Sequence, residues 1–166
     1  MIRRFIPLCS AILIALGVFL APQLAHAKCY SMKEAEAEQG LRIHSELMVI
    51  GLNCQHLWPK NQPNLYLQYR NFTHEHAKLF SDYERTMLAF YKDEGVSNPE
   101  SKLHQLRTDF ANEISEDAAR MRPDTFCRVY APRIPKANKM DNTKLKKWAS
   151  TVYPNHPVSR AICAKN

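Results

Sequence analysis

Apolar side chains recur at spacings of three and four residues along most of the chain, which is the period of an amphipathic helix. The longest unbroken stripe of this kind runs from Leu65 to Phe90 and predicts one continuous helix. Its members are Leu65, Tyr69, Phe72, His76, Leu79, Tyr83, Met87 and Phe90. The Pro-rich stretch "WPKNQPN" precedes this helix and "DEGVSNPE" follows it, so loops are expected at both ends.

A second helix is predicted upstream, from just after Ser31 to about Cys54. The sequence "SMKE" is a capping box, in which the Ser31 hydroxyl accepts a hydrogen bond from the Glu34 amide and the Glu34 carboxylate accepts one from the Ser31 amide. The apolar positions of this helix are Ala37, Leu41, Leu47, Met48, Ile50 and Leu52.

The second half of the chain predicts two more helices and a short helical segment. Asn98 followed by Pro99 is a suitable start for a helix that ends before Pro123. A short segment at 124–130 follows, then the loop "APRIPKAN", a last helix from Asn142 to Val152 and an irregular tail. The apolar stripe of the long helix is Leu103, Leu106, Phe110, Ile114, Ala118 and Met121; that of the last helix is Leu145, Trp148, Ala149 and Val152.

Three long helices with short connections should run up, down and up, with the last helix descending against them. The sequence therefore predicts an all-α, up-and-down bundle of four or five helices. Residues 28–166 form its single domain, and the portion from about residue 122 onward is basic and contains prolines. A content of only 4 glycines agrees with a helical chain.

Residues 1–27 have the features of a secretory signal peptide. Arg3 and Arg4 precede the apolar run "AILIALGVFLA", and "AHA" ends at Ala27, so cleavage before Lys28 is expected. The apolar run is too short to span a bilayer. The mature protein is therefore predicted to be periplasmic or secreted, and not transmembrane after cleavage.

Four cysteines remain after the signal peptide, and in an oxidising compartment they predict two disulfides. Cys29 and Cys54 lie at opposite ends of the first helix, about 37 Å apart. They cannot pair, because bridged Cα atoms lie within about 7 Å of each other. The order of the helices brings Cys127 to the same end of the bundle as Cys54, and Cys163 to the same end as Cys29. The predicted bridges are Cys54–Cys127 and Cys29–Cys163.

Two histidines interrupt the apolar stripes of neighbouring helices, His44 in the first and His76 in the second. Both lie about 15 Å from the same end of the bundle, so they are expected at one level of the core. Asp109 or Glu113 of the third helix falls at about that height. His74, in the same "HEH" as His76, is excluded as a second ligand beside His76, because residues two apart on a helix point about 200° apart.

The histidine pair has three interpretations. A buried polar layer of neutral imidazoles would fix the helix register, or one histidine would lie partly exposed at the bundle edge. The third interpretation is a binding or pH-sensing site, with His44 and His76 as ligands of a transition metal. The sequence lacks the Glu-x-x-His motifs of di-iron bundles, and non-covalent haem would need Met48 or Met87 as an axial ligand. The first interpretation involves no cofactor and is preferred.

The charge is distributed unevenly along the chain. Residues 28–119 carry a net charge of −4, whereas residues 120–166 carry +9. The excess either complements the acidic helices of the same molecule or contacts an anionic partner, namely an acidic protein or an envelope surface. Nucleic acid is not favoured, because no nucleic-acid-binding motif is present. The candidate partner-binding residues are Arg128, Arg133, Lys136, Lys139, Lys144, Lys146 and Lys147.

These observations support three hypotheses of function. The first is a non-enzymatic exported binding protein, such as an inhibitor, an immunity factor or a stress-response accessory, that contacts an anionic partner. The second is a metal- or small-ligand-binding bundle centred on His44 and His76. The third is an envelope hydrolase, but no catalytic residue is assigned, because neither GxSxG nor a phosphate-binding glycine loop occurs.

Overall fold

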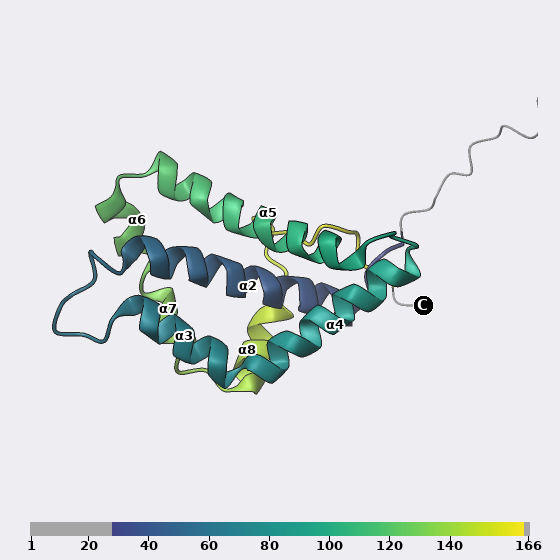
Figure 1. Ribbon diagram of the computed structural model, residues 1–166, viewed down its shortest axis with the longest axis horizontal. Coiled ribbons are helices and arrows are strands. Elements are labelled where there is room, and N and C mark those ends of the chain that lie inside the picture. Colours follow the sequence, from purple (N-terminus) through teal and green to yellow (C-terminus); the bar gives the residue numbers. More distant parts are fainter. Residues whose placement is uncertain (1–27, 165–166) are drawn as a thin grey trace, which may run out of the picture.

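The computed structural model describes residues 28–164, and all regular elements in this part of the chain are helices (Figure 1). The predicted signal peptide, residues 1–27, lies outside the described residues. The helices are α2 (Met32–Cys54), α3 (Leu65–Glu75), α4 (Ala77–Asp93), α5 (Pro99–Arg120), α6 (Pro123–Tyr130), α7 (Arg133–Ala137) and α8 (Asn142–Ala149). The prediction of an all-α bundle is confirmed. Across residues 28–164, every helix is too short or too polar to serve as a membrane span.

Helix α2 is the centre of the fold. It lies between α5 and the α3–α4 pair, and it also contacts α6, α7 and α8 (Figure 1). Because neighbours surround it, α2 buries polar as well as apolar side chains. The buried polar residues of α2 are Glu38, Gln39, Arg42, Ser45 and Glu46.

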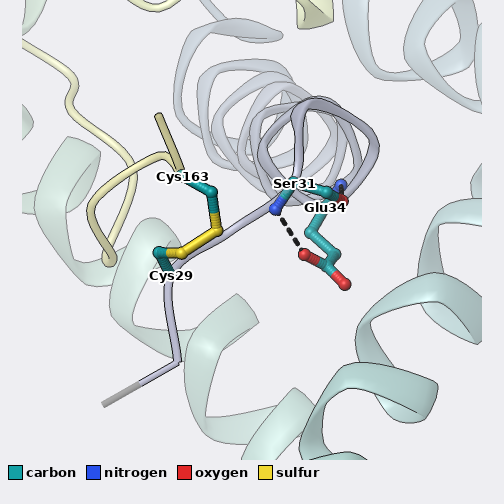
Figure 2. Close-up of a disulfide and its surroundings, with 4 residues drawn as sticks. All are labelled: Cys29, Ser31, Glu34 and Cys163. Atoms are coloured by element: carbon teal, nitrogen blue, oxygen red, sulfur yellow. Dashed lines mark hydrogen bonds between the residues drawn. A yellow bond between two sulfur atoms is a disulfide. The ribbon is translucent and has the colours of Figure 1, made fainter. Parts of the chain in front are cut away.

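The N-terminal end of α2 is fixed by its cap and by a disulfide, as Figure 2 shows. The predicted capping box is present: the Ser31 amide donates to Glu34 Oε2 at 2.6 Å, and the Glu34 amide donates to Ser31 Oγ at 3.3 Å. Next to it, the Tyr30 amide donates to the Ala161 carbonyl at 2.8 Å. The cap and the C-terminal tail therefore meet at the same end of α2.

Both predicted disulfides are confirmed. The Cα atoms of Cys29 and Cys163 lie 5.1 Å apart, and those of Cys54 and Cys127 lie 5.3 Å apart. One bridge is just before α2 begins and the other is at its last residue. The chain therefore folds back on itself as expected, with one bridge at each end of the central helix.

The prediction of one continuous helix over 65–90 is wrong. The helix breaks at His76, whose φ of −104° and ψ of 14° are not helical, and Figure 1 shows the bend between α3 and α4. The predicted apolar stripe is nevertheless buried on both sides of the break, because its positions in α3 and in α4 all face the core. The bend lets α3 pack on α7 while α4 packs on α5.

Two smaller expectations in the C-terminal part are also wrong. The segment predicted as a loop contains α7, a single turn held by Ile134 and Ala137, both fully buried. The last helix ends at Ala149, so Val152 lies outside it and is 37% exposed. The α7 turn was missed because one turn with two apolar residues is too short for its period to be recognised in a sequence. Outside the C-terminal part, Leu52 of the apolar stripe predicted for α2 is also exposed, at 44%.

Gly40 of α2 packs directly against the Tyr83 ring of α4. A Cβ atom at Gly40 would overlap two ring carbons of Tyr83. The ring cannot easily move away, because Tyr83 is 5% exposed and its hydroxyl donates to Glu36 Oε1 at 2.9 Å. Glycine at this position therefore sets how closely α2 and α4 approach.

We expect Gly40→Ala to lower the free energy of unfolding by about 1–3 kcal/mol, because the clash outweighs the gain of about 1 kcal/mol that alanine has over glycine in a helix. Gly51→Ala is the matched control on the same helix, since a Cβ there would lie 3.4 Å from Ile134 Cδ1, an ordinary contact. Urea unfolding of the two variants measures the difference. Equal stability of both would contradict the close approach of α2 and α4.

Candidate functional site

The seven cations predicted to bind a partner are spread over three helices and one connection. Arg133 is half-buried, and the other six are exposed. Arg133 pairs with Glu46, and Lys144 pairs with Asp141; within residues 28–164 the other five make no ion pair. The positions are Arg128 on α6, Arg133 and Lys136 on α7, Lys139 after α7, and Lys144, Lys146 and Lys147 on α8.

A cavity of about 380 Å³, here called the α2–α7 cavity, lies where α2, α7, α8 and the following tail meet. Of the predicted cations, only Arg133 and Lys136 line it. The other lining residues are Gln39, Arg42, Ile43 and Glu46 of α2, Met140 and Trp148, and Thr151, Tyr153, Asn155 and His156 of the tail. The cavity thus combines cations, one carboxylate and apolar or aromatic side chains.

Glu46 is the carboxylate of the cavity and is 9% exposed. Burial raises the pKa of its carboxyl above the ordinary value, while the positive charges of His156, Arg133 and Arg42 act in the opposite direction. Its oxygens lie 3.4 Å from Arg133 Nη1 and 3.8 Å from His156 Nδ1. Glu46 therefore joins α2 to α7 and to the tail.

Arg42, one turn before Glu46, is 6% exposed. Its guanidinium pairs with Glu113 of α5, donates from Nη2 to the Pro157 carbonyl at 3.2 Å and lies 4.2 Å from the centre of the Phe110 ring. Its Nε is buried and has no hydrogen-bond partner within the described residues. Arg42 thus lines the cavity with one of its donors unused.

The tail that closes one side of the cavity is held by polar side chains of α2. Gln39 Nε2 donates to the His156 carbonyl at 2.7 Å. The preceding residue, Glu38, is fully buried and accepts hydrogen bonds from the Ser159 amide at 2.6 Å and from the Tyr30 hydroxyl at 2.7 Å. The tail has no helix of its own, so these contacts determine its path.

His44 and His76 hydrogen-bond to different residues. His44 Nε2 lies 3.2 Å from the Tyr69 hydroxyl, and the His44 ring packs edge-on against Phe80. His76 is 5% exposed, and its Nδ1 lies 2.6 Å from Asn142 Oδ1 at the start of α8. Within residues 28–164, no group of three or more His, Cys, Asp and Glu side chains is placed to hold a metal ion.

The acidic residues expected beside the histidines have other surroundings. Glu113 pairs with Arg42, and Asp109 is exposed on α5. Beside His44 there is a small cavity of about 200 Å³ that Glu84 and Arg107 also line, and these two pair at 2.8 Å. The surroundings of His44 are thus an aromatic contact, a hydroxyl and a neighbouring ion pair.

The buried charged residues of α2, two of which line the α2–α7 cavity, were missed by reasoning from apolar periodicity. Glu38, Arg42 and Glu46 recur at a spacing of four, which places them on one face of α2. A charged stripe of this kind normally faces solvent, and the sequence does not reveal that helices and the tail cover it. His156 is a single histidine in a proline-containing tail and gives no periodic signal.

No protein-family model matches the chain, and neither a curated protein nor a solved structure is detectably similar to it. The kind of ligand that the site binds must therefore be inferred from the residues of the site itself. Cations, a buried carboxylate and an apolar wall in one cavity are suited to binding a ligand that carries a negative charge.

His44 makes folding sensitive to acid. Burial, helped by the charge of Arg107, lowers the pKa of His44 from 6.5 to about 4. The unfolded chain therefore takes up a proton near pH 6.5, whereas the folded protein resists it down to about pH 4. The stability that His44 contributes is fully present above pH 6.5 and is lost as the pH falls toward 4, by about 2–3 kcal/mol.

We expect His44→Gln to reduce this acid-induced loss of stability by about 2–3 kcal/mol, since glutamine does not titrate. Urea unfolding at about pH 7 and about pH 4 measures the loss for each variant. His74→Gln removes an exposed histidine from a neighbouring helix and should leave the loss unchanged. The same loss in wild type and His44→Gln would contradict the lowered pKa.

Proposed function

We propose that this protein is an exported, non-enzymatic binding protein that contacts an anionic partner through its basic C-terminal segment, residues 128–147. The partner is an acidic protein or an anionic envelope surface, and nucleic acid is not favoured. Roles of this kind include an inhibitor, an immunity factor and a stress-response accessory. The single observation that carries the proposal is the set of cations on α6, on α7, on α8 and in the α7–α8 connection that make no ion pair within residues 28–164.

Five of the seven cations in the segment are exposed and make no ion pair within residues 28–164. Cations without a carboxylate neighbour add their charge to a positive field that attracts an external anion. Between residues 28 and 164, the acidic half of the chain pairs with the portion from residue 122 onward through Glu46 and Glu94 alone. This favours an external partner over simple charge balance inside the molecule.

Two disulfides support a periplasmic or secreted location. Bridges that join distant parts of a chain form and persist in oxidising compartments. The bridges here span 134 and 73 residues, so they constrain most of the domain. The signal-peptide features of residues 1–27 support the same location.

We expect the triple reversal Lys144→Glu, Lys146→Glu and Lys147→Glu to abolish salt-sensitive capture of a partner from the native cell envelope. Far-UV circular dichroism and the unfolding midpoint should remain close to wild type, because the three side chains are exposed. Capture by wild type should itself weaken as salt is raised from about 50 to about 300 mM, since exposed charges are screened.

The matched control is Lys60→Glu, Lys78→Glu and Lys102→Glu, which changes the net charge equally at three exposed lysines of the acidic half. This control should retain capture. Equal loss in both triple variants would mean that only net charge matters, and retention in the α8 variant would remove α8 from the contact surface.

A further inference from the structure

The α2–α7 cavity has the size of a small-molecule site, and we propose that it binds a small organic carboxylate with an apolar body. Its volume of about 380 Å³ is within the usual range of ligand pockets, roughly 300–1,000 Å³. This inference goes beyond the macromolecular partner, whose test variants are the exposed lysines of α8. Lys136 of α7 is also one of the proposed partner-binding cations, but it lines the cavity and therefore tests the cavity apart from the α8 lysines.

The charge inside the cavity favours one anionic group. Three permanent cations line it, Arg42, Arg133 and Lys136, against the single carboxylate of Glu46. Arg42 is paired with Glu113 of α5, and Arg133 is paired with Glu46. Lys136 makes no ion pair within residues 28–164, so one positive charge at the cavity remains to be neutralised.

One buried donor on a residue that lines the cavity also has no acceptor within the described residues. Arg42 Nε is buried and forms no hydrogen bond there, whereas His156 Nδ1, also without a hydrogen bond, lies 3.8 Å from the Glu46 carboxylate. A buried donor without an acceptor costs about 1–3 kcal/mol, so an acceptor-rich group is favoured there. A carboxylate has two oxygens and accepts several hydrogen bonds, including a forked pair from a guanidinium.

The rest of the wall is suited to a hydrocarbon body. Ile43, Met140 and Trp148 line the cavity, and Trp148 is half-buried against the core. Tyr153, on the tail, is 48% exposed at the same cavity. An aromatic or aliphatic group would be covered by these side chains, while the cations hold its charged end.

Glu46 gives the site a defined pH dependence. The charged groups that face it are Arg42 on its own helix, Glu113 on α5, Arg133 on α7 and His156 on the tail, with Tyr130 of α6 nearby. Burial raises the pKa of Glu46, and an incoming carboxylate raises it further by repulsion. Binding therefore takes up protons, and affinity increases as the pH falls.

Binding can be tested with phenylacetate, 3-phenylpropionate and hexanoate, each paired with its neutral amide. The fluorescence of Trp148 reports binding in a Trp58→Phe background, because the chain has 2 tryptophans. We expect at least one acid to bind with a Kd below about 10 mM and about tenfold more tightly than its amide. Affinity should also increase as the pH is lowered from neutral, because binding raises the pKa of Glu46 further.

Lys136→Gln should weaken binding of that acid by about tenfold, whereas Lys139→Gln, an exposed lysine that does not line the cavity, should not. Arg133→Gln should weaken it as well, and Lys136→Gln decides the question if the Arg133 variant fails to fold. The proposal is overturned if no acid binds below about 10 mM, if acids and amides bind equally, or if the Lys136 and Lys139 variants behave alike. These outcomes are independent of the Lys144, Lys146 and Lys147 variants.

Discussion

The buried charged stripe of α2 is the constraint on which much of the fold depends. Glu38, Arg42 and Glu46 lie on a helix that is covered on most sides, and a buried charge without a partner is strongly destabilising. Partners come in reverse chain order from the tail, which reaches Glu38 through Ser159, Arg42 through the Pro157 carbonyl and Glu46 through His156. The tail has no helix, and it runs antiparallel to α2, a path that brings a polar partner to each charged residue of the stripe.

The same stripe explains which features the sequence predicts and which it does not. The spacing of apolar residues and the direction of successive helices were sufficient to predict the bundle and both disulfides. Each helix buries its apolar face, and this face can be recognised from the helix's own sequence. The break at His76 leaves the period intact, so only the packing of α3 on α7 and α4 on α5 reveals it. Residues such as Arg42 and Glu46 resemble a solvated face in sequence, and their burial depends on segments about a hundred residues away.

The basic C-terminal segment contains cations in two different surroundings. Arg133 faces inward at the α2–α7 cavity and is paired with Glu46, while Lys146 and Lys147 on α8 are exposed and have no carboxylate partner within residues 28–164. A half-buried guanidinium is oriented by its neighbours, whereas exposed ammonium groups act over a distance that salt limits. One stretch of sequence thus contains both an oriented, half-buried guanidinium and exposed ammonium groups.

The two bridges are nested: the 54–127 pair lies inside the interval closed by the 29–163 pair. In a chain exported N-terminus first, as the proposed location implies, Cys29 and Cys54 emerge long before either correct partner. The length of α2 keeps these two thiols apart once the helix has formed, so early helix formation protects against the wrong crosslink. Because the bridges are nested and α2 holds the first two thiols apart, neither native bridge has to be reopened for the other to form.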